Sequence, residues 1–406
     1  MPPMKVLFLA PQPFFQERGT PIAVKLAMEV LSERFANQAE SRVDLLTYHE
    51  GSNIEIPGIF LQRISGCNFI KGVGPGISLK KLICDFAFFF LAIKMAFRNR
   101  HNQYDIVHAV EESVFVALML KIIFGIPYIY DMDSSIALQL SEKWWLLRPL
   151  APLFSFFERI AVRFSDAVVP VCDALAEIAI RHGSKDTHIL RDISLMDVSG
   201  LKQKIDLRSE ILASSQDLIL LYVGNLESYQ GVELLAESFS KAAEDKPQAR
   251  LVIIGGSEVH VRELKALASQ LRNSERIHIL GPRSVADLGA YLLQADILAS
   301  PRTKGNNTPM KIYSYLHSGK AIVATNLSTH TQVLNKTVSI LCEPTVESFA
   351  DGILKIISNH DLRSQLGKAA FQLAEENYTF AVFKRRLNEL YDRISKKLCQ
   401  PLLKAL

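Results

Sequence analysis

Apolar residues along the chain fall into short continuous runs, separated by longer stretches with helical spacing. Residues 6–10 are all apolar, and a polar loop and a helical pattern over 21–35 follow them. Continuous rather than alternating apolar strands are typical of parallel sheets that helices cover on both faces. The pattern therefore predicts strands and helices in alternation. The other predicted strands are 43–47, 106–109, 128–130, 167–171, 218–223, 251–255, 277–280, 297–299, 321–324 and 338–341.

A polar stretch at 199–217, rich in Lys, Ser, Asp and Gln, divides this alternation into two series. A length of 406 residues suits two domains of roughly 150–200 residues each. We expect an N-terminal domain over 1–198, a C-terminal domain over 199–378 and a final helix over 379–406. That helix either closes the second domain or crosses back onto the first. The predicted fold class is α/β, with two Rossmann-like, doubly wound domains that face a cleft.

Composition narrows the possible partners and compartments. The net charge of +4 is too small to make nucleic acid the default partner. Five scattered cysteines without a CxxC pair favour reduced thiols in the cytosol, and disfavour a disulfide framework or a structural zinc site. The most apolar segment, 82–97, contains Asp85 and Lys94 and is too short to span a bilayer. No G-x-G-x-x-G motif follows either first strand, which makes a nicotinamide dehydrogenase improbable.

Two loops of the first series carry candidate chemistry. In the loop 11–20, Gly19 and Thr20 precede Pro21, which suits a helix start with Thr20 as N-cap. Such a helix start binds anions or sugar hydroxyls, or Gly19 simply makes the turn. In the second loop, Asp131 and Asp133 follow a strand and precede two serines. Paired carboxylates there suit acid–base work or sugar recognition, but turn formation and helix capping explain them equally well.

The loop 300–311 of the second series is basic and leads into a predicted helix over 309–317. It contains Arg302, Lys304 and Lys311, together with the amides Asn306 and Asn307. Cations and a helix start at the carboxyl end of a strand can hold a polyanion such as a diphosphate. The alternative is a solvated basic loop.

The sequence GKAIVAT at 319–325 follows KIYSYL at 311–316. Both segments resemble the signature of glycosyltransferase family 4. The segments 221–232, 286–297 and 366–378 resemble other parts of the family pattern. The family contains retaining enzymes of the GT-B fold that use nucleotide sugars, so the resemblance implies this fold and activity.

Five positions depart from the family pattern, and four of these departures remove a charge. Asn225 and Gln230 stand where the family has Arg and Lys on its phosphate loop. Asn306 and Ser314 stand at its paired glutamates in an ungapped comparison, and Asp133 stands at its histidine. Either the cations of the loop 300–311 replace the lost charge, or the donor site has decayed.

The resemblance implies a hexosyltransferase that moves a sugar from a nucleotide sugar to a glycan or a lipid-linked acceptor in cell-surface polysaccharide synthesis. We expect no cofactor beyond this co-substrate and no metal, because Lys and Arg can neutralise the leaving diphosphate. The alternatives are a non-catalytic GT-B binding protein and a nucleotide-sugar epimerase. The expected donor-binding residues are Gly224, Asn225, Gln230, Arg302, Lys304, Asn306, Asn307, Lys311 and Ser314; Gly19 and Thr20 are expected to bind the acceptor, and Asp133 to be catalytic.

Three segments combine aromatic side chains with cations, as segments at bilayer interfaces do. They are 79–98, 144–148 and 153–157. We expect either peripheral contact with the inner face of the cell membrane or simple packing of these helices on the first sheet. A cytoplasmic protein is expected in both cases.

Overall fold

A computed structural model describes residues 3–16, 19–38, 40–74, 78–99, 104–137, 149, 151–196, 205–305 and 307–403. The chain divides into two compact units. Met1–Arg191 and Phe383–Leu406 form the first unit, and Asp192–Val382 form the second. The second unit is therefore inserted, in sequence, between two parts of the first.

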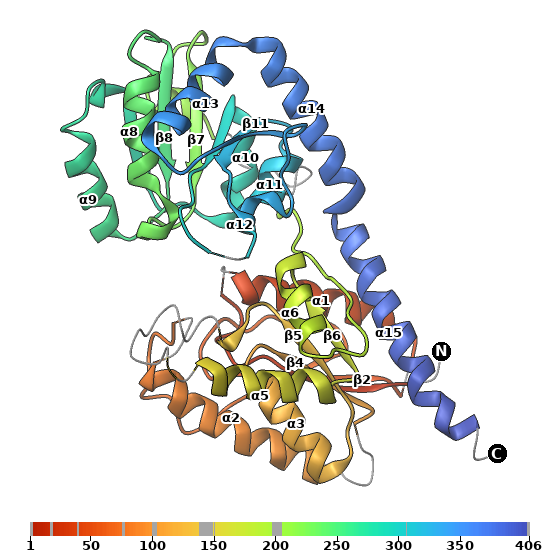
Figure 1. Ribbon diagram of the computed structural model, residues 1–406. Helices are drawn as coiled ribbons and strands as arrows, with labels where there is room; N and C mark the ends of the chain where they lie inside the picture. Colours follow the sequence, from red (N-terminus) through yellow and green to blue (C-terminus); the bar gives the residue numbers. More distant parts are fainter. Residues whose placement is uncertain are drawn as a thin grey trace. The chain divides into compact units, whose positions relative to one another are not determined.

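The first unit contains a six-stranded parallel sheet in the order β3-β2-β1-β4-β5-β6 (Figure 1). In this doubly wound order the chain changes direction between β1 and β4, and ligands bind such sheets at the carboxyl ends beside that point. The strands are β1 (Lys5–Leu9), β2 (Arg42–Thr47), β3 (Ile59–Arg63), β4 (Ile106–Val110), β5 (Tyr128–Met132) and β6 (Ala167–Pro170).

Helices cover both faces of this sheet. Side chains of one face, such as Leu7 and Val107, join the core with four helices: α2, α3, α5 and α6. On the other face, Phe8 and His108 stack on each other, and His108 stacks on Tyr391 of α15. The helices of this unit are α1 (Gly19–Phe35), α2 (Leu79–Arg98), α3 (Ser113–Phe124), α5 (Ala151–Phe164), α6 (Asp173–Arg181) and most of α15 (Phe380–Leu403).

The second unit repeats the architecture, with strand order β12-β11-β10-β7-β8-β9. Here the change of direction lies between β7 and β10, which pair in parallel. The strands are β7 (Leu218–Val223), β8 (Ala249–Ile254), β9 (Ile277–Gly281), β10 (Ile297–Ser300), β11 (Ala321–Thr325) and β12 (Ser339–Cys342). The helices are α7 (Leu207–Glu210), α8 (Val232–Ala242), α9 (Glu258–Ala268), α10 (Leu288–Gln294), α11 (Lys311–His317), α12 (Ser328–Thr331), α13 (Val346–Ser358) and α14 (His360–Asn377).

Two apolar cores hold the helices of the second unit onto its sheet. Leu220 and Ile253 face a core shared with α8, α9 and α13. Leu221 and Val252, their neighbours along the strands, face the opposite core with α7, α10, α11 and α14. Neighbouring residues of each strand thus face opposite cores. Because both faces of the sheet are buried, the strands consist of continuous apolar runs.

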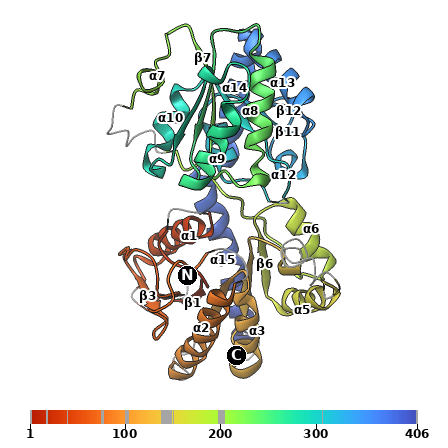
Figure 2. The ribbon, with the colours of Figure 1, turned by 90° about the vertical axis from the view of Figure 1, so that its left-hand side faces the viewer.

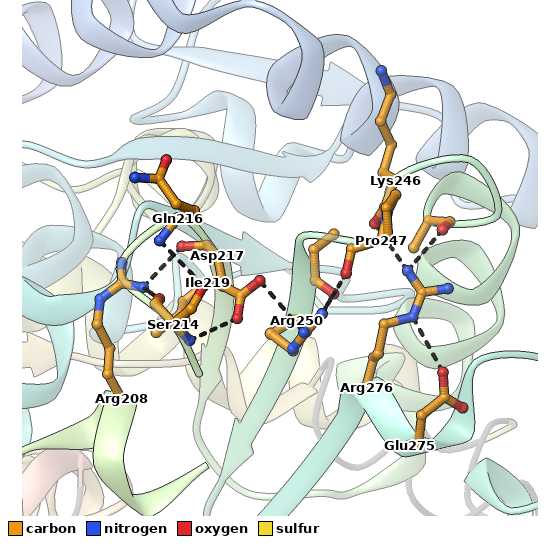
Figure 3. A network of polar contacts seen from close by, with 12 residues as sticks. Arg208, Ser214, Gln216, Asp217, Ile219, Lys246, Pro247, Arg250, Glu275 and Arg276 are labelled. Carbon is orange, nitrogen blue, oxygen red and sulfur yellow. Dashed lines mark hydrogen bonds and ion pairs between the residues drawn. The ribbon is translucent and has the colours of Figure 1, made fainter. Parts of the chain in front are cut away.

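Charged groups at the amino ends of the second sheet are matched to partners (Figure 3). Asp217, just before β7, accepts a hydrogen bond from the backbone N–H of Ser214 at 2.8 Å and pairs with Arg250 at 3.4 Å. Arg208 donates to the Asp217 carbonyl at 2.8 Å, and Arg276 donates to the carbonyls of two loop residues. These contacts close the edge of the sheet that lies away from the carboxyl ends.

Several predicted boundaries were wrong by a few residues. α1 begins at Gly19, so Thr20 lies in the first turn and is not the N-cap. The helix predicted from 309 begins at Lys311. Residues 205–217 of the polar stretch 199–217 contain α7. This helix packs on the core of the second unit through Leu207 and Ile211, which lie four residues apart and are buried.

None of the helices in the described part of the chain is long and apolar enough to cross a membrane.

Candidate functional site

The loop after β7 passes very close to two other backbone segments of the second unit, and glycines make this possible. Gly231 has φ 69°, and a Cβ there would lie 2.2 Å from the carbonyl oxygen of Pro301 in the loop after β10. The N–H of Thr303 donates to the Tyr229 carbonyl at 2.9 Å. Gly255 has φ 119°, and a Cβ there would lie 1.9 Å from the Gly224 carbonyl oxygen. The loops after β7 and β10 therefore form one surface at the carboxyl ends of the two strands.

Lys311 reaches from the first residue of α11 into this surface. Its ammonium lies 3.8 Å from the centre of the Tyr222 ring and 3.4 Å from Oε1 of Gln230. It also lies 3.1 Å from the place where a Cβ on Gly224 would be. The structure thus brings together three predicted donor-binding residues: Gly224, Gln230 and Lys311.

The electrostatic surroundings of Lys311 differ from those of the arginines in Figure 3, which pair with carboxylates. Among the described residues, no carboxylate forms an ion pair with Lys311. Burial and the neighbouring Arg302 lower the pKa of Lys311 well below its usual range. A half-buried cation without an opposite charge is costly for the protein, and a bound anion would relieve that cost.

Arg302 shapes the loop in which it lies. Its Nε donates to the carbonyl of Lys304 at 2.8 Å, and its Nη1 donates to the carbonyl of Asn307 at 3.1 Å. Gly305, at φ 123°, permits this arrangement, because a Cβ there would lie 2.7 Å from Nη2 of Arg302. The guanidinium also lies over the Tyr229 ring, 5.1 Å from its centre. Arg302 therefore organises the loop after β10 and raises the positive charge near Lys311.

The other predicted donor-binding residues have different surroundings. Lys304 and Asn225 are exposed, and Asn306 lies outside the described residues. Ser314 is only 1% exposed, and its hydroxyl oxygen accepts a hydrogen bond at 3.0 Å from the backbone N–H of Leu195. The Ser314 side chain thus holds the start of the second unit against α11.

A buried histidine supports the loop after β10 from below. His330 bonds through Nε2 to the hydroxyl of Ser300 at 2.8 Å, and its Nδ1 lies 3.1 Å from Oγ1 of Thr325. Thr325 in turn donates to the Arg302 carbonyl at 2.5 Å. Burial lowers the pKa of His330 to about 3, and the cations Lys311 and Arg302 add to this shift. A neutral imidazole therefore anchors the loop without competing for an anion.

In the first unit, the carboxyl ends of β4 and β5 gather acidic side chains. Asp133 is half-buried directly after β5. Asp131, two residues earlier, has an oxygen 3.3 Å from Nε2 of the buried His108. Glu111 follows β4 with φ 51°, and its N–H donates to the Asp131 carbonyl at 2.9 Å. Burial, followed by the nearby charge of Glu112, raises the pKa of Glu111 to about 7.

Comparison with known proteins identifies the type of chain. Residues 32–191 match the family model for a glycosyl transferase 4-like domain, and residues 203–373 match the model for glycosyl transferases group 1. Together the two models match well over half of the chain. The protein is a divergent member of glycosyltransferase family 4.

Individual relatives of this glycosyltransferase are distant in sequence. A D-inositol 3-phosphate glycosyltransferase of Corynebacterium efficiens is 21% identical over 357 residues, covering 82% of this chain and 81% of the relative. Sucrose-phosphate synthase of Thermosynechococcus elongatus superposes with a TM-score of 0.74 at 18% identity, covering 97% of this chain and 100% of that one. HepE of Anabaena, in complex with UDP-glucose, superposes with a TM-score of 0.70 at 16% identity, covering 96% and 100%. These structures share the two-domain GT-B fold that the sequence predicted.

Two residues described above, His330 and Glu111, were not among the functional residues predicted from the sequence. His330 gave no signal, because its partners Ser300 and Thr325 come from two separate strands. Glu111 lies in the Val110-Glu111-Glu112 sequence after a predicted strand, and two adjacent carboxylates there were a signal that could have been used.

Gly19 and Thr20 form the start of α1. No group of three or more His, Cys, Asp or Glu in the described ranges is arranged to hold a metal ion.

Proposed function

We propose that this glycosyltransferase transfers a hexosyl unit, with retention of configuration, from a nucleotide sugar to a glycan or lipid-linked acceptor in cell-surface polysaccharide synthesis. The observation that carries the proposal is the Lys311 ammonium, which lies where the chain direction changes and has no carboxylate partner among the described residues. A nucleoside diphosphate supplies the anion that this position lacks. The complex of HepE with UDP-glucose, which has the same fold, supports a nucleotide sugar as the donor.

In this proposal, Lys311 stabilises the negative charge that develops on the leaving diphosphate. Bond cleavage at the anomeric carbon places that charge on the phosphate oxygens, and a fixed cation beside them lowers the barrier. Lys311 then carries the charge without a metal ion. Gln230, 3.4 Å from the ammonium, positions it, and Gly224 leaves room for the diphosphate to approach.

We assign the acceptor to the first unit. Asp133, at the carboxyl end of β5, would orient the attacking hydroxyl, and the start of α1 at Gly19 and Thr20 would bind other acceptor oxygens. In a retaining transfer, a donor phosphate oxygen can take the proton of this hydroxyl. A strong protein base is then unnecessary. We place the reaction at the cytoplasmic face of the cell membrane.

The test is nucleotide binding by isothermal titration calorimetry, with UDP, GDP, ADP, CMP and their sugars as ligands. We expect one nucleoside diphosphate to bind selectively, and Lys311→Met to weaken it by about 10- to 100-fold, as the loss of a charged hydrogen bond does. Because the pKa of Lys311 is lowered in the free protein, binding should also take up a proton, and the affinity should fall as the pH rises. Lys311→Met should abolish this uptake.

Lys336→Met is the matched control, because Lys336 is an exposed lysine of the same unit that lies before β12, away from the carboxyl ends of the strands. It should retain nearly wild-type affinity and proton uptake. Equal affinity of Lys311→Met and the wild type would show that Lys311 does not bind the diphosphate. A folded wild-type protein that binds none of these nucleotides would refute the donor site.

One observation favours a second candidate, a non-catalytic GT-B binding protein. The hydroxyl of Ser314, at a position where the family pattern has a glutamate, is occupied by the backbone of Leu195. A decayed donor site would show this loss of a ligand-binding side chain. Release of free sugar from a bound nucleotide sugar, or its transfer to an acceptor, would exclude the candidate.

A further inference from the structure

Three helices of the first unit expose many large apolar side chains. α2 exposes six, α5 four and α3 three, and Phe86 on α2 is 67% exposed. The helices lie side by side over one face of the sheet (Figures 1 and 2). We call their exposed side the outer helical face. Its apolar members are Leu79, Leu82, Ile83, Phe86, Phe90, Phe97, Met119, Ile122, Ile123, Leu153, Phe156, Phe157 and Phe164.

Packing within the first unit does not account for these residues. On α2 the buried residues Cys84, Phe88, Ala92 and Ala96 recur every four residues and form the stripe that packs on the core. Phe86 and its exposed neighbours lie on the opposite side of the helix. A surface helix of a water-soluble protein normally carries polar residues there. An exposed apolar area spread over three helices is typical of an interaction surface.

The charges around the outer helical face have a single sign. Lys80, Lys94 and Arg98 are exposed on α2, and Arg159 and Arg163 are exposed on α5. None of the carboxylates on α2, α3 and α5, whose residues are all described, is exposed. Asp85 bonds to the hydroxyl of Tyr48, and Glu158 is buried. α9 of the second unit, in contrast, exposes cations and carboxylates together.

We propose that the outer helical face docks on a lipid bilayer that contains anionic lipids. Phenylalanine, leucine and isoleucine side chains enter the boundary between headgroups and acyl chains, while the surrounding Lys and Arg bind lipid phosphates. No described helix can cross the bilayer, so the contact is peripheral. A second copy of the chain fits this face poorly, because two copies would bring cations against cations.

This inference deepens the proposed function, since a lipid-linked acceptor is met at a membrane. Vesicle binding is measured without donor or acceptor, however. Its failure would leave nucleotide binding at Lys311 untouched, and failure of nucleotide binding would leave the docking face untouched. The two proposals can therefore be refuted separately.

The experiment is flotation of the full-length protein with vesicles of phosphatidylcholine, with or without about one-third phosphatidylglycerol. We expect binding to the anionic vesicles that decreases with salt. The double variant Phe86→Ser with Phe90→Ser should bind at least about tenfold more weakly, because two aromatic rings no longer enter the interface. Lys94→Glu with Arg98→Glu should lose more than about tenfold on anionic vesicles, since each cation near such a surface contributes about fivefold.

The control is Val259→Ser with Leu354→Ser, which removes two exposed apolar side chains from helices of the second unit. This variant should bind vesicles as the wild type does. Wild-type protein that stays unbound with anionic vesicles would overturn the proposal. So would equal losses in the control and in the Phe86 and Phe90 variant. Sedimentation velocity tests the remaining possibility, which is self-association. The proposal would be overturned if the wild type were a dimer that binds no vesicles and the Phe86 and Phe90 variant were a monomer.

Discussion

Gly231 allows the two loops of the proposed donor site to touch, because it has no side chain. Its φ of 69° is left-handed, and a Cβ would lie 2.2 Å from the Pro301 carbonyl oxygen. Gly231→Ala should therefore separate the loops. We expect a loss of at least about 2 kcal/mol of stability, from left-handed strain and displacement of the backbone. The nucleotide affinity should also fall. Urea unfolding measures the stability, and calorimetry measures the affinity.

Gly125→Ala separates these two effects. Gly125 follows α3 with a similar φ of 73°, but a Cβ there would meet no atom within 4 Å. This variant should lose only the strain of about 1 kcal/mol and should bind the nucleotide normally. Equal losses in both variants would mean that the contact with Pro301 does not hold the loops.

Glu111 should make the stability of the first unit depend on pH. An ordinary glutamate titrates near 4.5, whereas the pKa of folded Glu111 is raised to about 7, first by burial and then by Glu112. Between these values the folded protein keeps a proton that the unfolded chain releases, so stability falls as the pH rises. Glu111→Gln should remove this loss and stabilise the protein at pH 8 by on the order of 1 kcal/mol.

The same variant should differ little from the wild type at pH 4, where both states carry the proton. Asp85, whose pKa is also raised to about 6, leaves the variant some decline of the same sign. The control is Glu237→Gln on an exposed position of α8. If Glu111→Gln and Glu237→Gln gave the same melting temperatures across this pH range, the proposed titration of Glu111 would be wrong.

At the scale of elements, continuous apolar runs predicted nearly all of both sheets, because strands buried on both faces have only one sequence signature. β3 was missed for the opposite reason. Its residues alternate between half-buried and exposed, and it ends in Gln62 and Arg63 because it lies at the sheet edge. The final helix predicted over 379–406 corresponds to α15, which begins at Phe380 after α14 has ended.

The candidate site was predictable where its residues lie near the carboxyl ends of strands. Gly224 directly follows β7, and Lys311 begins α11 after the loop that follows β10; the doubly wound order brings such loops together. Contacts that depend on side-chain direction could not be predicted. Ser314 lies in α11, which follows the loop after β10, and it was expected to bind the donor. Its hydroxyl oxygen instead accepts a hydrogen bond from the backbone N–H of Leu195.

At the scale of the whole molecule, the first unit is built from both ends of the chain. Leu387, Leu390 and Ile394 of α15 are buried, and the Tyr391 hydroxyl lies 3.0 Å from Nδ1 of His108. Arg34 of α1 pairs with Asp392 at 2.6 Å. Residues 1–191 alone therefore lack the part of the cover of one sheet face that α15 provides.

We expect a fragment of residues 1–191 to be unable to fold cooperatively. Each of the four buried side chains named above, Leu387, Leu390, Tyr391 and Ile394, contributes about 1.5–3 kcal/mol, and their sum is comparable to the entire stability of a domain. Joining residues 383–406 to the fragment through a flexible Gly/Ser linker should restore a cooperative transition in thermal circular dichroism. The same fusion with Leu387→Asp and Leu390→Asp should not, because a charged α15 cannot cover Phe8 and His108. A fragment of residues 1–191 that melts cooperatively would contradict this prediction, because it would show that the fragment folds without α15.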